Sequence, residues 1–72
     1  MRRLTAIIQQ QGELFVALCP ELDIASQGST VEEARTNLIE ALELFFEATD
    51  DQEVRERLAA DVYVTSVEIA VA

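Results

Sequence analysis

The sequence contains no histidine and no lysine, and it has only one cysteine, one proline and two glycines. Without histidine, catalytic triads and imidazole acid–base chemistry are excluded. The single cysteine excludes an intrachain disulfide, and one thiol without histidine cannot build a zinc site. Cys19 lies between Leu18 and Pro20 and is expected to be a buried side chain rather than a nucleophile. Gly12 and Gly28 stand too far apart for a phosphate-binding loop. The sequence therefore predicts a protein that is not an enzyme and carries no cofactor or metal.

Basic residues are also scarce, since five arginines face 14 acidic residues and the formal net charge is −9. Nucleic-acid phosphates and acidic membrane surfaces attract clustered Lys and Arg, so this charge opposes direct binding to either. A strongly acidic surface either serves solubility or meets a basic protein partner, whose complementary field speeds association. Composition alone leaves both interpretations open.

Long apolar runs are absent as well. The first ten residues, MRRLTAIIQQ, have too short an apolar run for a secretory signal and no small-residue cleavage site. No segment approaches the roughly 20 apolar residues of a membrane span. With one free thiol in addition, the expected location is the cytoplasm. A chain of 72 residues is expected to form a single domain, residues 1–72, with a thin core that self-association would extend.

Short apolar runs predict a β-hairpin near the N-terminus. Residues 4–10 and residues 14–19 form two such runs, joined by the turn-forming pair Gly12-Glu13. Pro20 is expected to end the second strand, because proline has no N–H to donate to a strand ladder.

The next stretch predicts a short edge strand followed directly by a helix. Residues 24–27 form the strand and Gly28 closes it. Thr30 and Glu33 then form a capping box, in which the Thr30 hydroxyl accepts from the N–H of Glu33 and the Glu33 carboxylate reaches back to the N–H of Thr30. This pattern fixes the start of the helix.

The helix is expected to run to Ala48 or Thr49, because apolar residues recur at three- and four-residue spacing. The members of this stripe are Val31, Ala34, Leu38, Ala41, Leu42 and Phe45, with Ile39 and Phe46 on one flank. Leu44 lies on the opposite side among glutamates. It is either an ordinary exposed leucine or part of a subunit contact.

Two further elements are expected after this helix. Asp50 or Asp51 provides a second helix cap, and a short helix is expected over residues 52–60. The final stretch, DVYVTSVEIAVA, is rich in β-branched residues and predicts a fourth strand. Its two faces would be Tyr63, Thr65, Val67, Ile69 and Val71 on one side, and Val62, Val64, Ser66, Glu68 and Ala70 on the other. The expected fold is an α+β two-layer sandwich of order β-β-β-α-α-β.

A row of glutamates marks one side of the long helix. Glu40, Glu43 and Glu47 surround Leu44, and Glu33 lies further back along the helix. Paired carboxylates can bind Mg²⁺ or Ca²⁺ or share acid–base roles, but on an exposed helix without histidine they are more often solvated or face a partner. Glu40, Glu43, Leu44 and Glu47 are therefore the candidate partner or subunit interface.

The stretch from the second strand into the helix, LCPELDIASQGSTVEEARTNLIEALELFFE, resembles the HicB-type antitoxin family. The residues that fall on the family's pattern are Pro20, Gln27, Gly28, Thr30, Glu33 and Ala34, followed by Asn37 and Ala41. The resemblance extends over residues 4 to about 48, and the last strand matches only in type. Each of these residues is common by itself, whereas their ordered combination is not.

The resemblance implies a partial RNase H-like fold and a non-catalytic antitoxin that masks a small basic mRNA-cleaving toxin of the HicA type. RNase H enzymes carry an acidic residue on the first strand, whereas residues 4–11 contain none. Many family members also carry a C-terminal DNA-binding domain, which is not expected here, and neither is direct operator binding. A homo-oligomer is expected from the thin core. The alternative is an orphan, self-associating structural or regulatory domain without a toxin, and a third possibility is a metal-dependent enzyme that uses the glutamate row.

Overall fold

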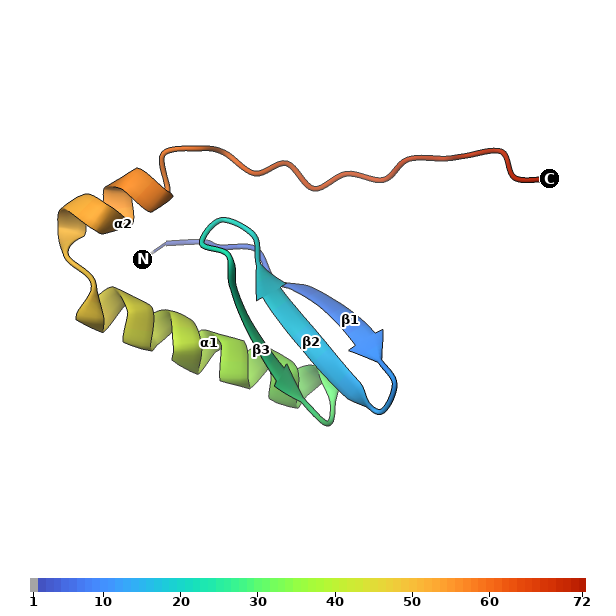
Figure 1. Ribbon diagram of the computed structural model, residues 1–72, viewed down its shortest axis with the longest axis horizontal. Coiled ribbons are helices and arrows are strands. Elements are labelled where there is room, and N and C mark those ends of the chain that lie inside the picture. The colour runs from blue at the N-terminus through green and yellow to red at the C-terminus, as the bar shows by residue number, and fades with distance from the viewer. Residues whose placement is uncertain (1) are drawn as a thin grey trace.

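Three short strands form one antiparallel sheet in the order β1-β2-β3, and two helices follow (Figure 1). The computed structural model describes residues 2–72. The elements are β1 (Ile7–Gln11), β2 (Leu14–Cys19), β3 (Ile24–Gly28), α1 (Val31–Ala48) and α2 (Asp51–Arg57). The α+β class, the three-stranded sheet and the two helices are confirmed, and the order is β-β-β-α-α.

The predicted hairpin is present, with β1 starting later than expected. β1 pairs with β2 so that Ile7 lies opposite Leu18 and Gln11 lies opposite Leu14. Gly12 has a φ of 63°, which is the positive value that a two-residue hairpin turn with glycine at its first position uses. Residues 4–6 precede the ladder, although their sequence resembles that of a strand.

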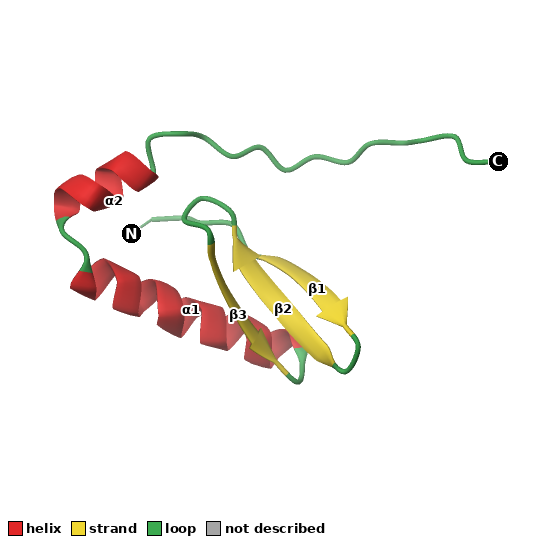
Figure 2. Cartoon of the chain, in the orientation of Figure 1, coloured by secondary structure: helices red, strands yellow, loops and turns green. Residues whose placement is uncertain are grey.

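Helix α1 covers one face of the sheet unevenly, packing chiefly on β3, less on β2 and least on β1 (Figure 2). The side chains of Phe15, Ala17 and Cys19 alternate along β2 and share the face that meets the helix. Within residues 2–72 the fully buried core consists of Ala17, Cys19, Leu22, Ala34 and Leu38. A core of this size is thin, as the short chain led us to expect.

The apolar stripe of α1 faces this core over most of its length. Ala34 and Leu38 are buried, and Leu42 and Phe45 pack against them from the next turns. Val31 is half exposed, so the contact with the sheet begins one turn later than the stripe predicted.

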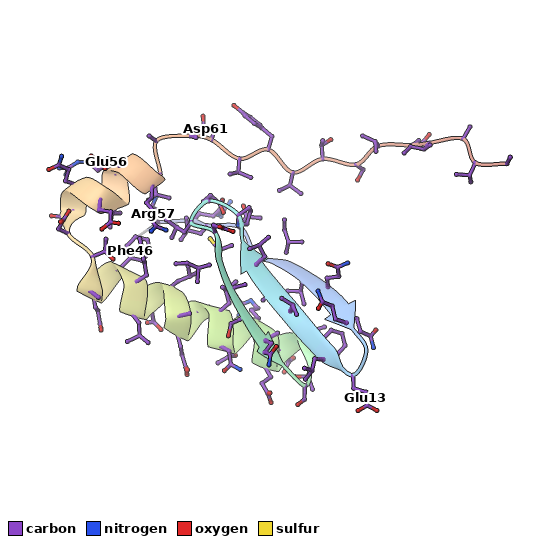
Figure 3. The ribbon with its side chains drawn as sticks, viewed as in Figure 1. Glu13, Phe46, Glu56, Arg57 and Asp61 are labelled. Atoms are coloured by element: carbon purple, nitrogen blue, oxygen red, sulfur yellow. The ribbon has the colours of Figure 1, made fainter. Side chains whose placement is uncertain are left out.

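Helix α2 is held to the rest of the molecule by its C-terminal residues. Its N-cap is Asp50, which accepts a hydrogen bond from the N–H of Glu53 at 2.8 Å. Figure 3 shows Arg57 between α2 and the rest of the molecule. Its guanidinium donates to the carbonyl of Leu22 at 3.3 Å and lies 5.4 Å from the centre of the Phe45 ring. The helix predicted over residues 52–60 is present, but it ends earlier, at Arg57.

The prediction of a C-terminal fourth strand was wrong. Residues 61–72 form no strand and extend away from α2 as a coil (Figure 2). An alternating apolar pattern predicts which faces a strand would have, but a strand exists only where a neighbour accepts and donates its backbone hydrogen bonds. The radius of gyration is 14.3 Å, whereas a compact domain of this length would have about 11 Å.

Within residues 2–72, neither helix is long and apolar enough to cross a membrane.

Candidate functional site

One of the two predicted capping-box hydrogen bonds at the start of α1 is present, and the other has a different donor. The Thr30 hydroxyl accepts from the N–H of Glu33 at 3.0 Å. The Glu33 carboxylate accepts from the N–H of Ser29 at 2.9 Å, not from Thr30 as predicted. The Ser29 N–H lies between the strand and the helix, outside the regular hydrogen bonds of both, so it is a donor that needs this acceptor.

Gly28 and Asn37 join the end of β3 to the helix. A Cβ at Gly28 would lie 2.6 Å from the backbone nitrogen of Ala34 and 2.8 Å from the carbonyl carbon of Glu33, so only glycine permits this approach. The Asn37 amide donates to the carbonyl of Gln27 at 2.8 Å. Ala34 is also buried. The residues that resemble the HicB pattern therefore have a structural role at the corner between the sheet and the helix.

Pro20 is the first of the residues that resemble the HicB pattern. It follows β2 directly and begins the turn that leads to the buried Leu22. The strand ends at Cys19, the residue before Pro20, where the sequence predicted it to end.

A contact between Thr5 and Glu21 joins two segments that no sequence pattern had related to one another. The Glu21 carboxylate accepts from the backbone N–H of Thr5 at 3.0 and 3.1 Å and from its hydroxyl at 2.6 Å. Burial by itself would raise the pKa of Glu21, but the hydrogen bonds from Thr5 and from the Glu21 backbone outweigh it and lower the pKa. No local pattern predicts a pair sixteen residues apart. The contact fixes the N-terminal stretch to the turn after β2.

Cys19 is fully buried, as predicted. Burial raises the pKa of its thiol, and the neighbouring Glu21 carboxylate, 3.5 Å from Sγ, raises it further. A thiol with a raised pKa stays protonated at neutral pH and is a poor nucleophile. Its role is packing in the core.

The four residues of the predicted interface lie together on the outer side of α1. Glu40, Glu43, Leu44 and Glu47, here called the acidic face, line one shallow open hollow of about 330 Å³. All four are exposed, and Leu44 has 64% of its surface accessible. The structure thus places these side chains beside one another, as their helical spacing predicted.

The acidic face is electrostatically unfavourable for its own helix. Glu43 and Glu47 lie toward the negative end of the α1 dipole, and the last turn contains no basic residue. Like charges three and four residues apart also repel. Within residues 2–72 the one ion pair joins Arg57 and Glu53 on α2. The acidic face therefore carries charge that the described chain does not neutralise.

A second hollow of about 320 Å³ lies between the N-terminal stretch and the start of the C-terminal coil. Residues 2–4 and residues 60–63 line it, together with Glu21 and Leu58. Two arginines and two acidic residues share this lining, so it has no dominant charge. Its main significance is that it places the start of the C-terminal coil beside the residues that precede β1.

Within residues 2–72, no three histidine, cysteine or acidic side chains form a group that could hold a metal ion. Comparison of the chain with protein-family models, with curated proteins and with solved structures found no match.

Proposed function

We propose that this chain is a non-catalytic, HicB-like antitoxin domain that binds and neutralises a small basic mRNA-cleaving toxin of the HicA type. The observation that carries the proposal is the acidic face, an unneutralised row of carboxylates around an exposed leucine. The resemblance of the corner residues to the HicB pattern supplies the identity of the partner. The proposed location is the cytoplasm, and the net charge of −9 favours a protein partner over direct binding to nucleic acid.

The acidic face has the arrangement of a small protein contact. Glu40, Glu43 and Glu47 would steer a basic partner toward the helix, which mainly increases the rate of association. Leu44 at their centre would supply apolar area that becomes buried on contact. Binding through such a surface is expected to weaken with salt, because exposed charges are screened over about 8–10 Å at physiological ionic strength.

The test uses a short basic protein encoded beside this chain's own reading frame. Co-expression with the chain should relieve the growth arrest that this protein causes. The triple variant Glu40→Gln, Glu43→Gln and Glu47→Gln should bind it more weakly, on the order of tenfold.

The control is a second triple variant with the same change in charge elsewhere, Glu13→Gln, Glu56→Gln and Asp61→Asn. These side chains lie at the hairpin tip, on α2 and at the start of the C-terminal coil (Figure 3), and the control should bind as the unaltered chain does. Equal losses in the two variants would show that net charge, not the acidic face, is responsible. The absence of any basic neighbour, or recovery of RNA alone from native cells, would contradict the proposal.

A second candidate is a self-associating structural or regulatory domain without a toxin. It is favoured by the exposed apolar stretch after α2, which pairs with no strand within residues 2–72. A toxin-binding domain can also self-associate, so the two candidates differ in whether a basic partner exists.

A further inference from the structure

The C-terminal segment, residues 62–71, exposes most of its apolar surface. Tyr63, Val64, Val67, Ile69 and Val71 are between 62% and 88% exposed. The segment is extended and runs beyond the end of the sheet (Figure 1). The backbone of the segment makes no hydrogen bond to another backbone group within residues 2–72. Exposed apolar side chains on such an extended backbone are suited to pairing with an open strand edge.

The amount of exposed surface indicates how large the missing contact is. The chain exposes 5949 Å², whereas a compact protein of 8.0 kDa exposes roughly 4,450 Å². The excess is about 1,500 Å² per chain. Two chains that each buried this excess would remove about 3,000 Å², which lies in the range of obligate homodimers, about 2,000–5,000 Å².

The outer edge of β1 is the open edge that fits the C-terminal segment. β1 pairs with β2 on one side, and no strand of residues 2–72 lies on its other side. Of the three strands, β1 is also the one that α1 covers least. Its last three residues are glutamines, so the edge lacks the lysine or proline that commonly prevents strand addition. The hollow between residues 2–4 and residues 60–63 places the start of the segment beside the residues that lead into β1.

We propose that two copies of this chain form a twofold dimer by exchanging their C-terminal segments, each pairing with the outer edge of β1 in the other copy. This inference rests on the self-association named above and does not require a toxin. Each sheet would gain a fourth strand from the partner, and the strand predicted from sequence would form between chains rather than within one.

The point at which the segment leaves the folded chain favours exchange between two chains over pairing of the segment with its own β1. Leu58 packs against the core and Arg57 is bonded to Leu22, so the point from which the segment leaves is fixed. Only residues 59–61 separate this anchor from the segment, and short connections of this kind favour exchange between identical chains. Ten extended residues span about 33 Å, which is enough to reach a neighbouring molecule.

The first test is the mass of the full chain in solution. Sedimentation equilibrium should give about twice 8.0 kDa. Val67→Pro should shift the protein to monomer, because proline removes a backbone donor from the new strand pair. Its fold should survive, since no core residue lies in the segment, and circular dichroism checks this.

Leu44→Glu is the matched variant on the acidic face and should remain a dimer. A monomer from Leu44→Glu together with a dimer from Val67→Pro would assign the contact to the acidic face and overturn the proposal. A monomeric unaltered chain at all concentrations would overturn it as well. Neither result bears on toxin binding, which the glutamine variants of the acidic face test separately.

The second test identifies which strands meet. Chains carrying Gln9→Cys in β1 are mixed with chains carrying Val67→Cys, unfolded and refolded together, and treated with a short bismaleimide. Cys19 is buried and should not react. A covalent product joining one chain of each kind is expected.

Two other outcomes would overturn exchange. Cross-linking within a double variant at high dilution, without a mixed product, would show that the segment folds back on its own β1. Products that join only two Val67→Cys chains would show pairing between the segments themselves.

Discussion

The corner between β3 and α1 is well defined although its sequence is polar. The C-terminal segment, by contrast, has a strand-like sequence and forms no strand. The corner, residues 27–34, is polar and poor in large side chains, yet its backbone is fixed by side-chain hydrogen bonds. Glu33 and Thr30 accept from backbone N–H groups, and Asn37 donates to the carbonyl of Gln27. The segment, residues 62–71, is rich in β-branched residues, yet it pairs with no strand in residues 2–72. Local hydrogen bonds that close within a few residues determine structure directly, whereas apolar alternation requires a partner.

The first prediction compares a core leucine with an apolar residue of the segment. Leu38 is 1% exposed, so Leu38→Ala should lower the free energy of unfolding by about 3 kcal/mol through lost burial and a cavity. Val67→Ala should lower it by less than about 0.5 kcal/mol at concentrations where the chain is monomeric. Urea unfolding measures both.

The dimer provides a sharper version of this comparison. At concentrations where the chain is a dimer, Val67→Ala should become destabilising, because stability is then linked to association. A loss from Val67→Ala in the monomer as large as that from Leu38→Ala would show that the segment packs on its own chain.

The second prediction compares the two glycines. Gly28→Ala should cost about 2–3 kcal/mol, because the new Cβ would contact the backbone of the first turn of α1. Gly12→Ala should cost about 1 kcal/mol, because its φ of 63° is strained for alanine although the space around it is open. Equal effects in urea unfolding would contradict the assignment of Gly28 as a close-packing position.

The third prediction concerns the contact between Glu21 and Thr5. Glu21→Gln should lower the free energy of unfolding at neutral pH by about 1 kcal/mol, because charge-assisted hydrogen bonds are replaced by weaker ones at a partly exposed site. The pKa of Glu21 is lowered in the folded chain. The carboxylate therefore contributes fully above its unfolded pKa, and its contribution is lost as the pH falls through the lower, folded value.

Urea unfolding between neutral and acidic pH measures this dependence. The unaltered chain should lose more stability on acidification than the Glu21→Gln chain does. Glu13→Gln, at the exposed hairpin tip, is the control and should keep the pH dependence of the unaltered chain. An identical pH profile in Glu21→Gln would show that the contact with Thr5 contributes nothing.

Much of the fold could be predicted from local patterns. The bounds of β2 and α1 follow from a short apolar run, from Pro20 and from the Thr30 cap, all of which act within a few residues. The acidic face follows from helical spacing alone, because residues three and four apart share one side. The contact between Thr5 and Glu21 could not be predicted, since it depends on how the hairpin meets the turn after β2.

Local sequence patterns specify most of the strands and helices, the start of the long helix and the side of it on which the glutamates lie, and composition sets the strong negative charge. Tertiary packing determines which distant residues contact one another and whether residues 62–71 pair as a strand. The physical reason is that helix caps and helical faces are satisfied within a few neighbouring residues. A strand depends on a second strand, and the residues that supply it are not specified by the strand's own sequence.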